Sequence, residues 1–141
     1  MERKSSKRRD IKFFSGKNQT VVCVHSVEAR EYTKYLEGLP ALERYEVDLP
    51  LELARFPHLS VVDIRAEYFT LDWVSDFRLF FDDGTVAIRE FIKAQNLKKR
   101  AVVEQLELSR RYWQAVGIHD WKIVTDKALA SLKEVDYDSI C

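Results

Sequence analysis

Two runs rich in apolar residues flank the tripeptide Asp82-Asp83-Gly84, and no other feature constrains the fold of this chain as strongly. Asp-Gly between two such runs is a strong short-range signal for a β-hairpin. We therefore predict two paired strands, the first opening at Asp76 and the second carrying Glu90 near its end. The hairpin would bring these two carboxylates to neighbouring positions, where they would suit a hard divalent cation.

Side chains alternate between the two faces of a strand, so the sequence also predicts which residues of the hairpin share a face. In the second strand, Glu90 should lie on the same face as its neighbours two residues away, and Lys93 on the opposite face. In the first strand, the expected faces are Phe77, Leu79 and Phe81 on one side, and Asp76, Arg78 and Phe80 on the other. In the second strand, the expected faces are Val86, Ile88, Glu90 and Ile92 on one side, and Ala87, Arg89, Phe91 and Lys93 on the other.

The remainder of the chain predicts further strands and helices around this hairpin. A helix is expected from the N-cap Ser26 to about Glu37, and a core helix from Lys98 to Val116 with Trp113 on its apolar stripe. The expected strands are Thr20 to Val24, Tyr45 to Leu51, Val61 to Phe69 and Trp121 to Thr125, with a turn near Phe56-Pro57-His58 and a last helix over 127–135. This pattern predicts an α/β fold, a mixed sheet flanked by helices.

The length of 141 residues suits one domain, and 46% hydrophobic with 33% charged residues is typical of a soluble globular protein. We expect a basic flexible arm over 1–12, the domain over 13–135 and a tail over 136–141. The chain has no apolar run long enough to span a bilayer and no signal peptide, so we expect no membrane association and a cytoplasmic location. Cys23, Cys141 and the three histidines lack zinc-ligand spacing and are expected to be incidental.

The formal net charge is zero, but residues 1–20 hold seven Lys or Arg against two acids. Such a basic arm suits the phosphates of double-stranded DNA, and it equally suits a solvated terminus. The sequence has no Gly-rich phosphate loop and no serine-nucleophile motif, so no small-molecule cofactor is expected.

The runs from Leu106 to Gln114 and from Trp121 to Lys127 resemble the TnsA-type endonuclease subunit of heteromeric transposases. Towards the N-terminus, the residues that carry the resemblance are, in order, Ser26, Glu28, Leu36-Glu37, Pro40 and Tyr45-Glu46. The resemblance implies a restriction-endonuclease-like fold, cleavage of DNA at the ends of a mobile element, and a transposase or recombinase as partner protein.

The resemblance also implies a site that binds Mg²⁺ or Mn²⁺. Its metal ligands would be Glu28, Asp76 and Glu90, and its catalytic residues would be these three acids and Lys93. Two positions depart from the family pattern: the family's spacing selects Ala29 in place of Glu28, and Ile92 in place of Lys93. Only a β-bulge would turn Lys93 towards the acids.

Two alternatives remain open. A second register would use Glu52 in place of Glu28, although Pro50 and Pro57 leave little room for a helix there. The departures at Ala29 and Ile92 also fit a catalytically degenerate nuclease-fold module that binds DNA or a partner protein without cleaving.

Overall fold

The computed structural model describes residues 9–52, 59, 62, 64–65 and 73–131. The predicted turn near Phe56-Pro57-His58 and the expected tail lie outside the described residues, as does most of the strand predicted from Val61 to Phe69. The three residues of that run that are described, Val62, Ile64 and Arg65, are not in a strand.

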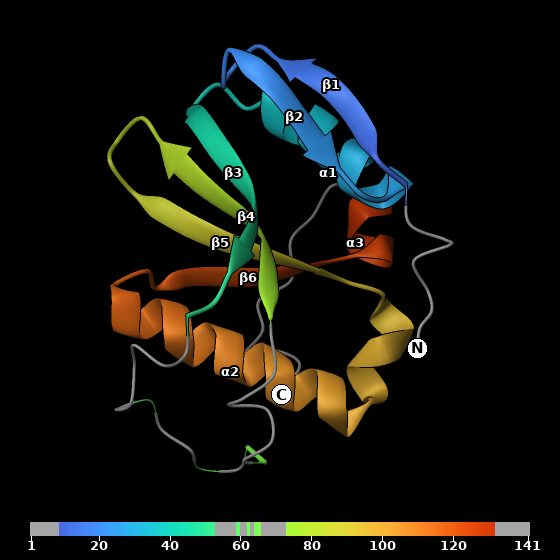
Figure 1. The fold of residues 1–141 in the computed structure, drawn as a ribbon, viewed down its shortest axis with the longest axis vertical. Coiled ribbons are helices and arrows are strands. Elements are labelled where there is room, and N and C mark those ends of the chain that lie inside the picture. Colours follow the sequence, from blue (N-terminus) through green and yellow to red (C-terminus); the bar gives the residue numbers. More distant parts are fainter. Residues whose placement is uncertain (1–8, 53–58, 60–61, 63, 66–72, 132–141) are drawn as a thin grey trace.

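The central sheet has four strands in the order β3-β4-β5-β6 (Figure 1). They are β3 (Leu42–Pro50), β4 (Val74–Phe81), β5 (Val86–Ile92) and β6 (Asp120–Thr125). The first three are antiparallel, and β6 pairs in parallel with β5, so the sheet is mixed, as predicted. A separate antiparallel pair is formed by β1 (Ile11–Ser15) and β2 (Thr20–Val24). Strand β1 begins inside the range expected for the flexible arm, and the sequence pattern did not predict it.

Helices cover both faces of the central sheet. Helix α1 (Val27–Glu37) lies with β1 and β2 on one face, and α2 (Arg100–Val116) lies across the other (Figure 1). A 3₁₀ helix, η4 (Ala94–Lys98), leads into α2, and the short α3 (Asp126–Ala130) follows β6. The predicted N-cap is confirmed: the Ser26 side chain accepts a hydrogen bond from the Ala29 amide at 3.0 Å. The chain therefore has the predicted α/β class.

The turn between β4 and β5 confirms the hairpin on which the prediction rested. Gly84 has φ +89°, a left-handed conformation that side chains with a Cβ rarely adopt. The Asp83 carboxylate accepts hydrogen bonds from the amide and the hydroxyl of Thr85, at 2.9 and 2.7 Å. These bonds lower the pKa of Asp83. The Asp83 side chain thus stabilises the turn between β4 and β5.

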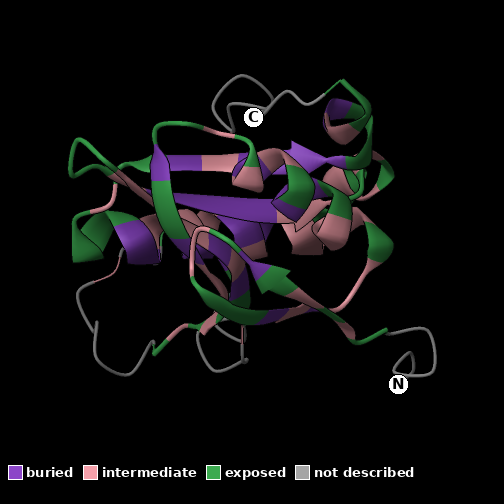
Figure 2. Cartoon of the chain, turned by 90° about the horizontal axis from the view of Figure 1, so that it is seen from above, coloured by how far each residue is buried: buried purple, intermediate pink, exposed green. Residues whose placement is uncertain are grey.

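The sheet separates two hydrophobic cores, and Figure 2 shows the buried residues concentrated in its strands. The first core lies under α1 and contains Val22, Val24, Tyr32, Leu36, Leu42, Tyr45, Phe77, Leu79, Ala87 and Val124. The second lies under α2 and contains Ile88, Leu106, Tyr112, Trp113, Trp121 and Ile123. The predicted place of Trp113 on the apolar stripe of α2 is confirmed, since it is buried in this core. Val116, at the C-terminal end of α2, is 43% exposed.

Gly117, which ends α2, should resist replacement by alanine. Its φ of +106° is left-handed, and a Cβ built there would contact nothing, so the cost of Gly117→Ala is conformational: about 1–2 kcal/mol of unfolding free energy. Gly38, which ends α1, has φ −89° and is the matched control: Gly38→Ala should be neutral or mildly stabilising. Urea denaturation of both variants measures the difference, and equal effects would contradict this assignment.

Candidate metal centre

Strands β3 and β4 both change face at one level of the sheet, and aspartates occupy that level in both strands. Val47 and Phe77 pack in the core under α1. Leu49, two residues after Val47, and Ser75, two residues before Phe77, face the α2 side instead. A regular strand would keep residues two apart on the same face. Asp48, between Val47 and Leu49, has φ +56°, which is rare for a residue with a side chain.

The hydrogen-bonded ladder between β4 and β5 ends beside Asp76. Its last pair at this end of the hairpin is Phe77 with Arg89. Beyond that pair, Asp76 Oδ2 accepts the backbone N–H of Phe91 at 2.6 Å, so a side-chain carboxylate takes an amide of the neighbouring strand. The backbone ladder between β4 and β5 therefore ends at the level of Asp76 and Glu90, the two acids named by the sequence.

Glu90 is completely buried, and three side chains donate hydrogen bonds to one of its carboxylate oxygens. Ser75 Oγ donates to Oε2 at 2.7 Å, Trp73 Nε1 donates at 3.2 Å, and Ser109 Oγ donates across from α2. Each serine hydroxyl in turn accepts an indole N–H, from Trp113 at 2.8 Å and from Trp121 at 3.2 Å. All three tryptophans of the chain thus orient this one carboxylate.

The other oxygen, Oε1 of Glu90, is buried and has no hydrogen-bond partner among the residues that the structure describes. A buried polar atom of this kind is rare in proteins and costs free energy unless a ligand satisfies it. Burial raises the pKa of Glu90, while the hydrogen bonds from Ser109, Ser75 and Trp73 and the backbone amide of Asp76 oppose that rise. The three side-chain donors all serve Oε2, so Oε1 is the oxygen most available to a cation.

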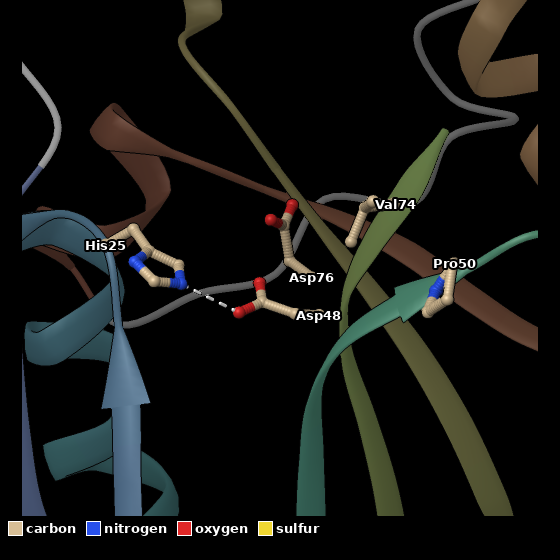
Figure 3. Close-up of a pocket in the computed structure, with 5 residues that line it drawn as sticks. All are labelled: His25, Asp48, Pro50, Val74 and Asp76. Atoms are coloured by element: carbon tan, nitrogen blue, oxygen red, sulfur yellow. Dashed lines mark hydrogen bonds and ion pairs between the residues drawn. The ribbon is translucent and has the colours of Figure 1, made fainter. Parts of the chain in front are cut away.

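Asp76 is next to this carboxylate and faces solvent through a cavity. Burial raises its pKa well above the usual value, the negative charge of Glu90 raises it further, and Asp48 adds to the effect; the Phe91 amide opposes it. An open cavity of about 560 Å³ is lined by His25, Asp48, Pro50, Val74 and Asp76 (Figure 3). A cation entering this cavity would relieve the repulsion that raises the pKa of Asp76.

The other two predicted site residues are not brought to this cavity. Glu28 is half-buried in the first turn of α1, but the α1 residue that lines a second, smaller cavity beside Asp76 is Ala29, which the family spacing also selects. Lys93 is exposed and lies one residue beyond β5. Strands β5 and β6 pair without a bulge up to Ile92, and Ile92 packs in the core under α2. The structure shows no bulge of β5 against β6 that would re-aim Lys93.

Sequence reasoning missed Asp48 and His25, which line the cavity with Asp76. Figure 3 shows the imidazole of His25 and the carboxylates of Asp48 and Asp76 pointing into the same space, with His25 bonded to Asp48. Asp48 comes from β3, and its position depends on the pairing of β3 with β4, which no local pattern encodes. The cross-strand partner could have been found only by setting Tyr45 to Leu51 against the first arm of the hairpin.

Asp76, Glu90 and Asp48 come from three adjacent strands and carry carboxylate oxygens, the ligands that Mg²⁺ and Mn²⁺ prefer. Their ligand atoms do not all lie within 4.8 Å of one another, so a shared ion would require these side chains to move closer. No family model matches the chain, and no curated protein sequence matches it. Among the described residues, no helix combines the length and the apolar character required to cross a membrane.

Proposed function

We propose that this protein is a DNA endonuclease subunit with a restriction-endonuclease-like fold. It would cut double-stranded DNA at the ends of a mobile element with Mg²⁺ or Mn²⁺, in the cytoplasm and beside a partner transposase or recombinase. The observation that carries the proposal is the unpartnered Oε1 of the fully buried Glu90 beside Asp76. Two adjacent carboxylates inside the fold are costly and serve no purpose in an apolar core. In metal-dependent phosphodiester cleavage, such carboxylates hold the metal ion.

Asp76 and Glu90 would hold the metal ion, and Asp48 supplies a third carboxylate at the mouth of the cavity. When bound, the metal would polarise the scissile phosphate and lower the pKa of an attacking water. The serine and tryptophan donors fix Glu90 through Oε2, so that Oε1 keeps its direction without a ligand. The family resemblance of α2 and β6 supports DNA as the substrate.

A catalytically degenerate module that binds DNA or a partner protein is the second candidate function. The exposure of Lys93 and the packing of Ile92 in the core favour it, since nucleases of this kind use a lysine at the Ile92 position to assist the attacking water. If the protein does cleave, it does so without a lysine at that position. In either case we expect Lys93→Ala to have little effect.

Incubation of the full chain with supercoiled and linear DNA, Mg²⁺ or Mn²⁺ and the partner recombinase tests the proposal. We expect metal-dependent nicking that Asp76→Ala reduces by about 10²-fold or more, because a metal ion supplies several kcal/mol of transition-state stabilisation. Glu43→Ala, which removes an exposed acid from the neighbouring strand β3, is the matched control and should cleave as the wild type does.

Absence of nicking under all these conditions would refute the nuclease. Retention of DNA or of the recombinase by the same inactive protein, without any requirement for metal, would establish the degenerate module instead. Cleavage that Asp76→Ala leaves intact would exclude this site as its origin.

A further inference from the structure

Asp10, Cys23 and His25, three residues of metal-ligating types, lie at one end of the β1–β2 hairpin, away from the strands that carry Asp76 and Glu90. Ile11 pairs with Val24 and Lys12 pairs with Cys23, so the next step of this ladder sets Asp10 beside His25. Cys23 and His25 are two residues apart and therefore share a face. One ligand atom from each of Asp10, Cys23 and His25 lies within 4.8 Å of the other two.

The imidazole of His25 is held between two carboxylates. Nδ1 lies 2.9 Å from Oδ1 of Asp10, and Nε2 lies 3.0 Å from Oδ2 of Asp48. A neutral imidazole carries one N–H, and both carboxylate oxygens only accept hydrogen bonds. One of the two contacts therefore requires a positive centre between the partners, which is either a second ring proton or a metal ion.

The thiol of Cys23 favours the second of these possibilities, a metal ion between His25 Nδ1 and Asp10. Within the part of the chain that the structure describes, the Cys23 thiol donates a weak hydrogen bond of 3.8 Å to the carbonyl of Val24. Metal-bound histidines usually donate their other ring N–H to a carboxylate, which fixes the ring orientation. The contact from Nε2 to Asp48, drawn in Figure 3, has this arrangement.

We propose that Asp10, Cys23 and His25 bind Zn²⁺ and that Asp48 orients His25 from the outer shell. A thiolate with an imidazole selects a borderline-soft ion such as Zn²⁺ over Mg²⁺. Zinc–ligand bonds of roughly 2.0–2.3 Å place neighbouring ligand atoms roughly 3.5 Å apart. The Asp10–His25 pair, at 2.9 Å, would open slightly, and the sulfur, within 4.8 Å of both ligand atoms, would approach by about 1 Å at most. The Asp10 side chain is 68% exposed, which leaves it free to move and leaves a coordination position for water.

This zinc site does not depend on the proposed function. It would clamp the start of β1 to the end of β2, and through His25 it would fix Asp48 at the mouth of the cavity that Asp76 lines. The β1–β2 hairpin and the central sheet have no strand in common, so the zinc site would connect the two through the contact of His25 with Asp48.

Titration of the full chain with Co²⁺, followed by competition between Zn²⁺ and a chromophoric chelator, tests the site. We expect one of the bound ions to give a thiolate-to-cobalt charge-transfer band. Cys23→Ser should abolish this band, whereas Cys141→Ser, which removes the other thiol of the chain, should keep it. Asp48→Asn should weaken Zn²⁺ binding by about 10–100-fold, the usual effect of losing an outer-shell carboxylate.

Asp76→Asn distinguishes the zinc site from the site at Asp76 and Glu90, since this variant should leave the thiolate-to-cobalt band unchanged. Circular dichroism of every variant shows that the chain is folded. Absence of a thiolate band in the wild type, or a band that survives Cys23→Ser, would overturn the proposal. A protein that binds neither Co²⁺ nor Zn²⁺ would likewise overturn it, and the contacts of His25 with Asp10 and Asp48 would then be hydrogen bonds alone.

Discussion

Asp76→Asn should stabilise the metal-free protein at pH 7, by about 1–3 kcal/mol of unfolding free energy. The aspartate is held beside two further negative groups, Glu90 and Asp48, and both raise its pKa in addition to its burial. Asparagine removes the charge and keeps an oxygen that can accept the Phe91 amide, which Asp76 binds at 2.6 Å. Loss of a candidate ligand would thus make the fold more stable.

The stabilisation should depend on pH in a defined direction. Because the pKa of Asp76 is raised in the folded protein, folding favours its protonated form. Its carboxyl group therefore contributes stability below the ordinary value of 3.8 and loses that contribution as the pH rises through the raised pKa. The advantage of asparagine should be small near pH 4 and grow towards neutral pH. Urea denaturation of both proteins across this range measures the difference, in which the acids remote from Asp76 cancel, whereas Glu90, which repels Asp76, contributes to it.

Mg²⁺ should reverse the order of stability. An ion that binds only the folded wild type stabilises it by mass action, whereas Asp76→Asn should show no such gain. Asp82→Asn, which replaces an exposed aspartate of the β4–β5 turn, is the matched control and should respond to Mg²⁺ as the wild type does. A difference between wild type and Asp76→Asn that is independent of both pH and Mg²⁺ would exclude a cation site at this residue.

Trp113→Ala should lower the free energy of unfolding by about 3–5 kcal/mol. The ring is 4% exposed in the core under α2 and packs edge-on against Tyr112, with 5.1 Å between ring centroids. Its indole N–H also donates to Ser75 Oγ at 2.8 Å, and Ser75 donates to Glu90. Since small domains are stable by about 5–15 kcal/mol, this loss is a large fraction of the total.

Trp113→Phe distinguishes packing from hydrogen bonding. Phenylalanine keeps most of the buried ring and removes the donor to Ser75, so we expect a smaller loss of about 1–2 kcal/mol. Urea unfolding followed by far-ultraviolet circular dichroism measures both variants, since the substitution changes the fluorescence itself. Equal destabilisation by alanine and phenylalanine would mean that the hydrogen bond, and not the ring volume, holds α2 against the sheet.

Local patterns predicted the elements that short-range rules determine. The Asp-Gly turn, the Ser26 cap and the stripe of α2 around Trp113 each depend on neighbouring residues, and all three were confirmed. The alternation of apolar residues in the two arms of the hairpin likewise predicted that Glu90 and Ile88 share a face, towards α2.

Features that depend on pairing between strands far apart in the sequence, or on an unusual backbone conformation, were not predicted. Strand β1 needs β2 as its partner, and its apolar residues Ile11 and Phe13 are separated by charged or exposed neighbours that resemble a loop. The place of Asp48 beside Asp76 follows from the pairing of β3 with β4 and from a positive φ that no propensity predicts. The metal ligand expected at Glu28 departs by one residue from the family spacing, which selects Ala29, and Ala29 is the α1 residue that lines the smaller cavity beside Asp76.

The change of face at Asp48 and Asp76 has a consequence for how the molecule unfolds. On one side of these aspartates, β3 and β4 supply side chains to the core under α1, and on the other side they supply the core under α2. A cation bound at this level would connect the two cores through both strands, so that neither core could open without releasing the ion. The metal-bound protein would then unfold as one cooperative unit, and the same aspartates without metal would form the weakest junction between the two halves.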